Sequence, residues 1–541
     1  MSTRRSGCGC LPIIGIIGAL AIAGGYAVKK GWHQLLIGQK LTPISGAKVI
    51  PDEAILTGFI STETNHWQQL ENLGLDETTT IIQQATTEID RELTELNLDY
   101  EEDIQSWLGN AMLAIVPETP NLDRQNTLVV LGIKNPINAY KFLKKVKTAE
   151  KDNLESVEYQ GIKINIVTDR QGDKTNLALL GNKIVISDEV TAIEQAIDTY
   201  RGEPSFASVT ENQIALKQPL KLKNNLVNIY LTDYNNLLTN SWGQSSSQAK
   251  LARLQPVESI VLGIGVEEKQ LKLKSFTELN PNLIVAESKP ITNKIANKFP
   301  EETIAFISGQ GISDFWSSMV TISEQDRDFN SLIDGVRNST RWVTGLDLDR
   351  DVFSWMDGEF AFGIVPTKQP VIPELNLRLG TVFLLESSDR NTATNTLNAL
   401  NKILQQQLGI ISQTKQLQKQ TVNQLLVPYS NTGITYGWLD NKNLLFTVGN
   451  DVFESIDNST QTSLAKSSDF QELARELPRK NQSYFYFNVD KALTQIKQIP
   501  GLPIDYNSET LMVLESIQSV GAASKMIDNN TSQTDMVVLF K

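Results

Sequence analysis

The alternation of apolar and polar positions divides the chain into two stretches that repeat one order of elements. The clearest repeat is a segment that occurs twice, as LDYEEDIQSWLGNAMLAIVP from Leu98 to Pro117 and as LDLDRDVFSWMDGEFAFGIVP from Leu346 to Pro366. In each copy an Asp stands where it can cap a short helix, a Ser-Trp pair follows, and an apolar run ending in Ile-Val-Pro predicts a buried strand. The signature residues of this repeat are Asp99, Asp103, Ser106, Trp107 and Pro117 in the first copy and Asp347, Asp351, Ser354, Trp355 and Pro366 in the second.

The elements that follow the signature also recur. Continuous apolar runs predict a central strand in each copy, at Thr127–Ile133 and Thr381–Leu385, and each run precedes an amphipathic helical pattern. In the first copy, Asp99 and Glu102 have the spacing of a reciprocal capping box. The other predicted elements are helices at Pro136–Val146 and Thr392–Leu404, a longer helical pattern at Glu77–Leu96, hairpin turns at Gln160-Gly161, Gly181-Asn182 and Asp440-Asn441, and loops at Ser241–Gln248 and Gln405–Gln420.

These patterns predict an α+β fold with two homologous tandem domains, each a mainly antiparallel sheet with packed helices, after one N-terminal transmembrane helix. A chain of 541 residues exceeds what one hydrophobic core usually serves, which agrees with two domains. The predicted boundaries are a basic tail at 1–10, a transmembrane helix at 11–28, a tether at 29–47, the first repeat at 48–279, a linker at 280–297 and the second repeat at 298–541.

An uncharged apolar run of 18 residues, Leu11–Val28, lies between Arg4-Arg5 and Lys29-Lys30. This length is close to the shortest that crosses a bilayer core as a helix, so the run predicts a signal anchor that contacts the membrane through residues 11–28. The alternative is a cleavable signal peptide, because Ala21-Ile22-Ala23 resembles a signal-peptidase site. In both cases the remaining residues cross the membrane. We therefore expect a single-pass membrane protein whose main body is periplasmic or thylakoid-lumenal.

Charge is unevenly distributed between the N-terminal segment and the body. The first 51 residues contain six basic residues and no Asp or Glu, which leaves 43 basic and 62 acidic residues and a formal charge of −19 on the rest. A body this acidic repels phosphate backbones and anionic lipid headgroups, which argues against nucleic acid and against a peripheral lipid surface as partners of the main domains. Cys8 and Cys10 are the only cysteines, so the predicted domains contain neither disulfides nor thiolate sites.

Few residues suit catalysis or metal binding. The chain has two histidines, His33 and His66, and it lacks Walker, Gly-x-Gly-x-x-Gly and Gly-x-Ser-x-Gly motifs, which disfavours nucleotide binding and serine hydrolase chemistry. Asp347, Asp349 and Asp351 alternate as at the start of a calcium loop, but a valine stands where the turn glycine belongs and no Glu follows at the twelfth position. These aspartates are weak metal-ligand candidates, and helix capping is the alternative role.

Tryptophans and carboxylates point to different functions. Trp67 and Trp316, which open helical patterns at matching places, are candidates to line an apolar groove between the repeats, although tryptophans in such positions also anchor cores. We therefore expect a membrane-anchored binding or scaffolding protein without a cofactor, whose partner is an unknown protein or a small apolar ligand. The alternatives are a carboxylate-dependent, hydrolase-like enzyme assisted by Ca²⁺, and an assembly factor or subunit of a larger membrane complex.

Three features together resemble a known family. They are the apolar N-terminal run, the proline and acidic pair that open each repeat at Pro51 and Pro300, and the Asp-(Ile/Val)-x-Ser-Trp signature. This combination resembles the cyanobacterial family known as domain of unknown function 3352, over essentially the whole chain. The resemblance implies a bacterial, membrane-associated protein, and it provides no catalytic residue to transfer to this sequence.

Overall fold

The computed structural model describes most of the chain from residue 40 onward. The described residues are 40–71, 73, 99–117, 125–149, 154–168, 172, 174–232, 257–280, 290–291, 294–324, 326–417, 419–426, 433–457, 462–501 and 509–541. The predicted tail, the predicted transmembrane helix at 11–28, most of the predicted tether and linker, the helical pattern at Glu77–Leu96 and the loop at Ser241–Gln248 lie outside them. Among the described residues, no helix combines the length and the apolar character needed to cross a bilayer.

The fold is α+β, and its strands pair antiparallel within two compact units. Of the described residues, 40–232 and Ser259–Glu268 belong to unit 1, and Val257, Glu258 and Lys269–Lys541 belong to unit 2. The sequence predicted that the first repeat ends at residue 279. In the structure, the strand at Gln270–Leu279 belongs to unit 2, because it pairs with the last strand of that unit.

The helices of unit 1 within the described residues are α2 (Pro43–Ala47), α3 (Thr64–Glu71), the π-helix η2 (Tyr100–Gln105), α5 (Pro136–Ala149), α6 (Val190–Arg201) and α7 (Thr210–Lys217). Its strands are β1 (Leu56–Ile60), β2 (Leu108–Pro117), β3 (Gln125–Ile133), β4 (Leu154–Tyr159), β5 (Ile162–Thr168), β6 (Lys174–Leu180), β7 (Lys183–Ser187), β8 (Asn225–Leu231) and β9 (Val257–Glu267). Across the sheet they follow the order β4-β5-β6-β7-β3-β2-β1-β8-β9, and every neighbouring pair is antiparallel.

Two tight turns of unit 1 explain how its outer hairpins form. Gln160 and Gly161, between β4 and β5, both have positive φ angles, 48° and 73°, as a type I′ turn requires. Gly181, between β6 and β7, has a φ of 63°, which a residue without a Cβ adopts at little cost. The turns predicted at these two places are confirmed.

The helices of unit 2 within the described residues are the 3₁₀-helices η4 (Lys294–Lys298), η6 (Pro373–Leu375) and η7 (Leu464–Lys466), the π-helix η5 (Leu348–Phe353), and α10 (Ile312–Ser323), α11 (Arg327–Thr344), α12 (Arg390–Leu408), α13 (Val452–Asp457), α14 (Ser468–Glu476), α15 (Val489–Ile496) and α16 (Glu509–Ser516). Its strands are β10 (Gln270–Leu279), β11 (Ala305–Gln310), β12 (Glu359–Pro366), β13 (Leu379–Glu386), β14 (Ile411–Leu417), β15 (Gln420–Leu426), β16 (Gly433–Trp438), β17 (Asn443–Val448), β18 (Ser483–Asn488), β19 (Ile517–Met526) and β20 (Thr531–Phe540).

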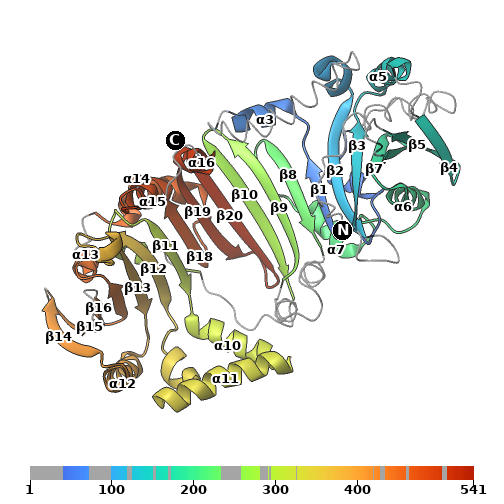
Figure 1. Ribbon diagram of the computed structural model, residues 1–541. Coiled ribbons are helices and arrows are strands. Elements are labelled where there is room, and N and C mark those ends of the chain that lie inside the picture. The colour runs from blue at the N-terminus through green and yellow to red at the C-terminus, as the bar shows by residue number, and fades with distance from the viewer. Residues whose placement is uncertain are drawn as a thin grey trace. The chain divides into compact units, whose positions relative to one another are not determined.

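The sheet of unit 2 has the strand order β14-β15-β16-β17-β13-β12-β11-β18-β19-β20-β10, again with antiparallel neighbours (Figure 1). From β14 to β19, this order repeats that of unit 1 strand for strand. The strands predicted at Thr127–Ile133 and Thr381–Leu385 are confirmed as β3 and β13, and the helices predicted after them are confirmed as α5 and α12.

One prediction for unit 2 is wrong. The Gln-rich stretch Gln405–Gln420, predicted to be a loop, contains the end of α12 and the whole of β14. β14 is an edge strand whose side chains are mostly exposed on both sides, so it lacks the apolar alternation by which a half-buried strand is recognised. Main-chain pairing with β15 maintains the strand without an apolar face.

Strand residues of unit 2 alternate between a buried face and a half-exposed face. On the buried face, Phe306, Val382, Leu445 and Tyr486 pack with residues of α13, η7 and α14 in one hydrophobic cluster. Trp355 belongs to a second cluster with residues of α12 and the outer strands. These clusters account for the helix-covered parts of the sheet.

Candidate functional site

The first copy of the signature forms a compact hydrogen-bonded arrangement around η2. The Asp99 carboxylate caps η2 by accepting the Glu102 N–H at 2.8 Å, and Asp103 Oδ2 accepts the Asp99 N–H at 3.1 Å. The indole N–H of Trp107 donates to the Asp103 carbonyl at 2.7 Å, and the Trp107 ring is buried against Phe142 of α5. The predicted capping box is therefore half right, because Asp103 rather than Glu102 accepts the N–H of the capping residue.

The second copy repeats this arrangement around η5. The Asp347 carboxylate accepts the N–H groups of Asp349 and Arg350, both at 3.1 Å, and Asp351 Oδ2 accepts the Asp347 N–H at 2.8 Å. The indole N–H of buried Trp355 donates to the Asp351 carbonyl at 3.0 Å. The spacing Asp-x-x-x-Asp-x-x-x-Trp thus joins a helix cap to the tryptophan that precedes the central strand. We name this arrangement the Asp-Trp clasp.

The cations that face the two clasps come from different places. In unit 1, Lys145 of α5 contacts both oxygens of Asp103, at 2.7 and 2.9 Å, and this contact raises the pKa of Lys145. In unit 2, Arg350 contacts Asp351 at 2.8 and 3.1 Å, and it lowers the pKa of Asp351. The pKa of Asp347 is also lowered, first by the Arg350 N–H at the helix start and then by the Arg341 guanidinium of α11.

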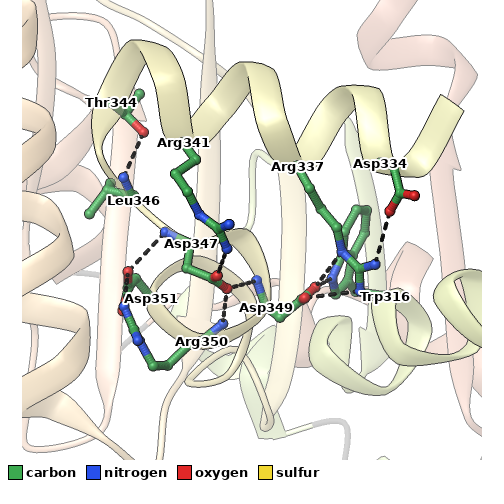
Figure 2. Close-up of polar contacts among 10 residues, drawn as sticks. All are labelled: Trp316, Asp334, Arg337, Arg341, Thr344, Leu346, Asp347, Asp349, Arg350 and Asp351. Atoms are coloured by element: carbon green, nitrogen blue, oxygen red, sulfur yellow. Dashed lines mark hydrogen bonds and ion pairs between the residues drawn. The ribbon is translucent and has the colours of Figure 1, made fainter. Parts of the chain in front are cut away.

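Asp349, the middle residue of the calcium-loop pattern, is held by α11 and α10 rather than by its neighbouring aspartates. Arg337 of α11 contacts Asp349 at 2.9 Å, and the indole N–H of Trp316 donates to the same carboxylate (Figure 2). The Trp316 ring stacks on Phe353 with a centroid distance of 4.6 Å. Among the described residues, no group of three or more His, Cys, Asp or Glu side chains converges to hold a metal ion.

The remaining candidates contact main-chain groups of their own unit. Trp67, the other predicted groove aromatic, is half-buried, and its indole N–H donates to the Ser61 carbonyl at 2.7 Å. His66 Nδ1 lies 3.2 Å from the Asn225 carbonyl and 3.3 Å from the Ser61 hydroxyl. The Asn225 carbonyl can only accept, so in the tautomer that bonds to it Nδ1 is the donor and does not act as a general base for Ser61.

The last four signature residues lie at the ends of the clasp and of the central strands. Ser106 follows η2 and is half-buried, whereas Ser354 is exposed and its hydroxyl donates to the Arg350 carbonyl at 2.5 Å. Pro117 and Pro366 are the last residues of β2 and β12, where each pairs with the first residue of the next strand, Gln125 and Leu379. A proline at the end of a strand removes one N–H from the ladder only where pairing stops.

A feature that the sequence analysis missed is a row of apolar residues on the half-exposed face of unit 2. Directly paired residues of an antiparallel sheet lie on one face. By this register the row crosses eight strands as Phe446, Phe383, Phe362, Ile307, Phe485, Ala522, Met536 and Leu273. Phe446 and Phe383 pack against the cluster of Trp355 and α12, so the part of the row outside that cluster runs from Phe362 to Leu273. None of these side chains is fully buried, and Ile307 and Phe362 are 44% and 39% exposed. We call this surface the open face of unit 2.

The rows on either side of the open face differ in polarity. On one side the neighbouring row is again mainly apolar, with Ile364, Ala305, Phe487, Val520 and Leu271. On the other side the row contains hydroxyl groups, with Ser483, Ser524, Thr534 and Ser275 in direct register, and the Ser524 and Thr534 hydroxyls are 2.8 Å apart. The surface therefore changes from aromatic and aliphatic to hydroxylic along the strand direction.

Unit 1 has an aliphatic counterpart of this surface. Its row contains Leu131, Ala111, Ile60, Val227 and Ile264, all half-buried and none aromatic. The sequence carried a signal for both rows, because the strands involved are apolar at successive positions instead of alternating. Such runs predicted central strands at Thr127–Ile133 and Thr381–Leu385, without indicating that one face is half-exposed.

Comparison with known proteins identifies the family of the chain. The family described as "Protein of unknown function (DUF3352)" matches residues 12–540. The chain belongs to the DUF3352 family. The DUF3352 match begins inside the predicted apolar run and extends across both units. No curated protein matches the sequence.

Solved structures match the DUF3352 chain weakly. Crystal form IV of TP0453 is 8% identical, with 46% of this chain and 83% of TP0453 covered and a TM-score of 0.28. Crystal form III of TP0453 is 10% identical over the same shares, with a TM-score of 0.25. Crystal form I of TP0453 is 9% identical over 43% of this chain and 78% of TP0453, also with a TM-score of 0.25.

Proposed function

We propose that this protein is a membrane-anchored binding protein that takes an amphiphile with an acyl chain on the open face of unit 2. The observation that supports this function is the apolar row from Phe362 to Leu273, in which Ile307 and Phe362 are exposed. Covering the exposed parts of these two side chains would contribute on the order of 3 kcal/mol to binding, since buried apolar area stabilises a complex in proportion to its size.

The hydroxyl row next to the open face supports an amphiphile over a purely apolar ligand. An acyl chain would lie along Phe362, Ile307 and Phe485, and its polar end would meet the hydroxyl groups of Ser483 and Ser524. Sites of this kind combine a large apolar lining with a few polar groups that orient the ligand. The proposal replaces the expected groove between the repeats with a surface inside one unit.

We also propose that the two units are copies of one ancestral domain and that residues 11–28 anchor them to a membrane. The shared strand order and the two Asp-Trp clasps support the duplication. The uncharged run between basic pairs supports the anchor and a periplasmic or thylakoid-lumenal body. The clasps serve each unit as structural elements in this proposal.

Site-specific photocrosslinking in the native membrane tests the ligand proposal. A benzophenone amino acid replaces Phe362, which preserves an aromatic side chain, and the matched control carries it at exposed Glu472 of α14. We expect an adduct of lipid mass at position 362 and none at 472, detected by intact-protein mass spectrometry. Ile307→Asp should reduce the adduct at position 362, because a carboxylate in the row would be desolvated by an acyl chain.

The second candidate function is a scaffold or assembly factor that contacts another protein through the same exposed residues. In that case the benzophenone at position 362 produces a cross-linked protein on a gel instead of a small adduct. A protein adduct, or equal labelling at 362 and 472, would refute amphiphile binding on the open face.

A further inference from the structure

Helix α11 buries Phe329 and Ile333 against α10 and leaves further apolar residues exposed to solvent. Arg337 of α11 contacts Asp349 of η5. Arg341, one turn later in α11, contacts Asp347, the residue that caps η5 (Figure 2). Leu332, Val336 and Val343 are exposed, Leu332 at 57%, although they are among the most apolar residues of the helix. A surface helix usually turns its apolar residues toward the core, so apolar residues left exposed beside a buried face are unusual.

The exposed residues form one stripe on α11. Positions 332, 336 and 343 are four and seven residues apart, a spacing that places side chains on the same side of an α-helix. Trp342 stands at one flank of this stripe and is 88% exposed. Phe329 and Ile333 are the buried apolar residues of α11, and they pack with Trp316, Met319 and Val320 of α10. The outward stripe is therefore additional to the contact that attaches α11 to α10.

The energies involved indicate that another surface covers the stripe. A surface ion pair contributes about 0.2–1 kcal/mol, whereas full burial of one large apolar side chain contributes about 1.5–3 kcal/mol. Covering Leu332, Val336 and Trp342 with another surface would therefore contribute more than the two arginine contacts of α11 do. The packing of Phe329 and Ile333 on α10, together with the ion pairs, holds α11 in an orientation that leaves the stripe available for a partner.

We propose that α11 docks in the plane of a lipid surface whose headgroups carry no net charge, with Leu332, Val336 and Val343 in the acyl region and Trp342 at the headgroup level. Amphipathic helices of this length bind at the boundary between headgroups and acyl chains, and tryptophan is enriched there. The predicted anchor at residues 11–28 places the body beside such a surface. This inference is independent of ligand binding on the open face.

Local charge agrees with a lipid surface. The body outside the first 51 residues has a formal charge of −19, which disfavours anionic lipid. Helix α11 departs from this balance, with three arginines against two aspartates between Arg327 and Thr344. A zwitterionic headgroup region tolerates both the acidic body and this helix, so we expect docking that is insensitive to salt.

The size of the stripe favours lipid over a second copy of the chain. An 18-residue helix is about 27 Å long and about 10 Å wide, so its footprint is roughly 270 Å². A stable protein interface buries about 800 Å² on each partner, several times more than this stripe offers. One amphipathic helix is sufficient for interfacial binding to a bilayer.

The test uses the full chain with single labelling sites. The only native cysteines, Cys8 and Cys10, are replaced by Ser, and single cysteines are introduced as Leu332→Cys and Val336→Cys. Asp334→Cys on the opposite side of α11 and Glu472→Cys on α14 are the controls, and both sites are exposed. Each variant carries an environment-sensitive fluorophore and is combined with phosphatidylcholine vesicles that contain a nitroxide-labelled lipid.

We expect quenching by the nitroxide lipid to be several-fold stronger at positions 332 and 336 than at 334 and 472, with the reverse order for quenching by iodide in water. Val336→Asp should abolish the lipid quenching at position 332 without changing the value at 472. The label reports lipid contact at α11 itself. If the N-terminal segment does not insert, less protein is on the vesicles, but the difference in quenching between positions of α11 is unchanged. Equal accessibility of positions 332 and 334 to iodide, or a disulfide that joins two copies of the unlabelled Leu332→Cys variant, would overturn the proposal.

Discussion

The indole N–H of Trp355 donates to the main-chain carbonyl of Asp351 at 3.0 Å, four residues earlier in the chain. Trp107 makes the same bond to Asp103 in unit 1 at 2.7 Å. In both units the aspartate also accepts the N–H of the residue that caps the π-helix. The spacing of four residues from Asp to Asp and from Asp to Trp therefore places each donor beside its acceptor in both units.

The two clasps should differ in their sensitivity to loss of the indole N–H. Trp107→Phe removes the donor for the Asp103 carbonyl, and the neighbouring α5 residue is Phe142, which cannot replace it. In unit 2, the Thr396 hydroxyl of α12 also donates to the Asp351 carbonyl. We expect Trp107→Phe to cost about 1–3 kcal/mol, and Trp355→Phe less, since an unpaired buried carbonyl carries a desolvation penalty. Hydrogen exchange of peptides from 99–117 and 347–366 measures the difference, and equal losses in both would contradict it.

The contact between Lys145 and Asp103 should stabilise unit 1 as a coupled pair. The Asp103 side chain is 9% exposed, so Lys145→Met leaves a nearly buried carboxylate with one fewer donor. We expect a loss of about 1–3 kcal/mol that Asp103→Asn partly restores in the double variant. Lys141→Met, an exposed lysine on the same helix, is the control and should be nearly neutral. Additive single and double effects in urea unfolding would show that the pair is uncoupled.

The unit 2 clasp should weaken in acid. The pKa values of Asp347 and Asp351 are lowered in the folded protein, so each carboxylate stabilises the fold while it is ionised. This contribution is fully present above the unfolded pKa of about 3.9 and is lost as the pH falls through the lower folded pKa. Asp347→Asn should therefore flatten the decline of stability between pH values of about 5 and 2. The measurement is hydrogen exchange or unfolding of unit 2 against pH, and an unchanged slope argues against the assignment.

Two neighbouring tyrosines of β18 should respond oppositely to loss of their hydroxyl groups. The buried Tyr484 hydroxyl has no hydrogen-bond partner among the described residues, whereas the Tyr486 hydroxyl accepts from Asn488 Nδ2 at 3.2 Å. Burial raises the pKa of both phenols, so both remain neutral and polar in the core. We expect Tyr484→Phe to be neutral or slightly stabilising and Tyr486→Phe to cost about 1 kcal/mol. Thermal unfolding of the two single variants measures the difference. Equal effects of the two substitutions would mean that both tyrosines contribute only by filling space in the core.

Local sequence was sufficient to predict many of the elements. The turns at Gln160-Gly161 and Gly181-Asn182, the strands β3 and β13 and the helices α5 and α12 follow from turn chemistry and periodicity over short windows. The edge strand β14 was missed because its stability comes from pairing with β15 and not from an apolar face of its own. The capping box was assigned to Glu102 because spacing alone does not distinguish it from Asp103.

The sequence by itself determined the family, the repeated Asp-Trp signature and the order of elements, since these depend on residues close together in the chain. Tertiary structure decided which apolar residues face water. Phe306 and Ile307 are neighbours of equal apolarity in β11, yet only Phe306 is covered by α14, which lies more than a hundred residues later in the chain. In the same way, Phe329 and Ile333 of α11 are buried against α10, whereas Leu332 and Val336 of the same helix are exposed. Burial is set by long-range packing, and a local pattern does not specify the packed partner.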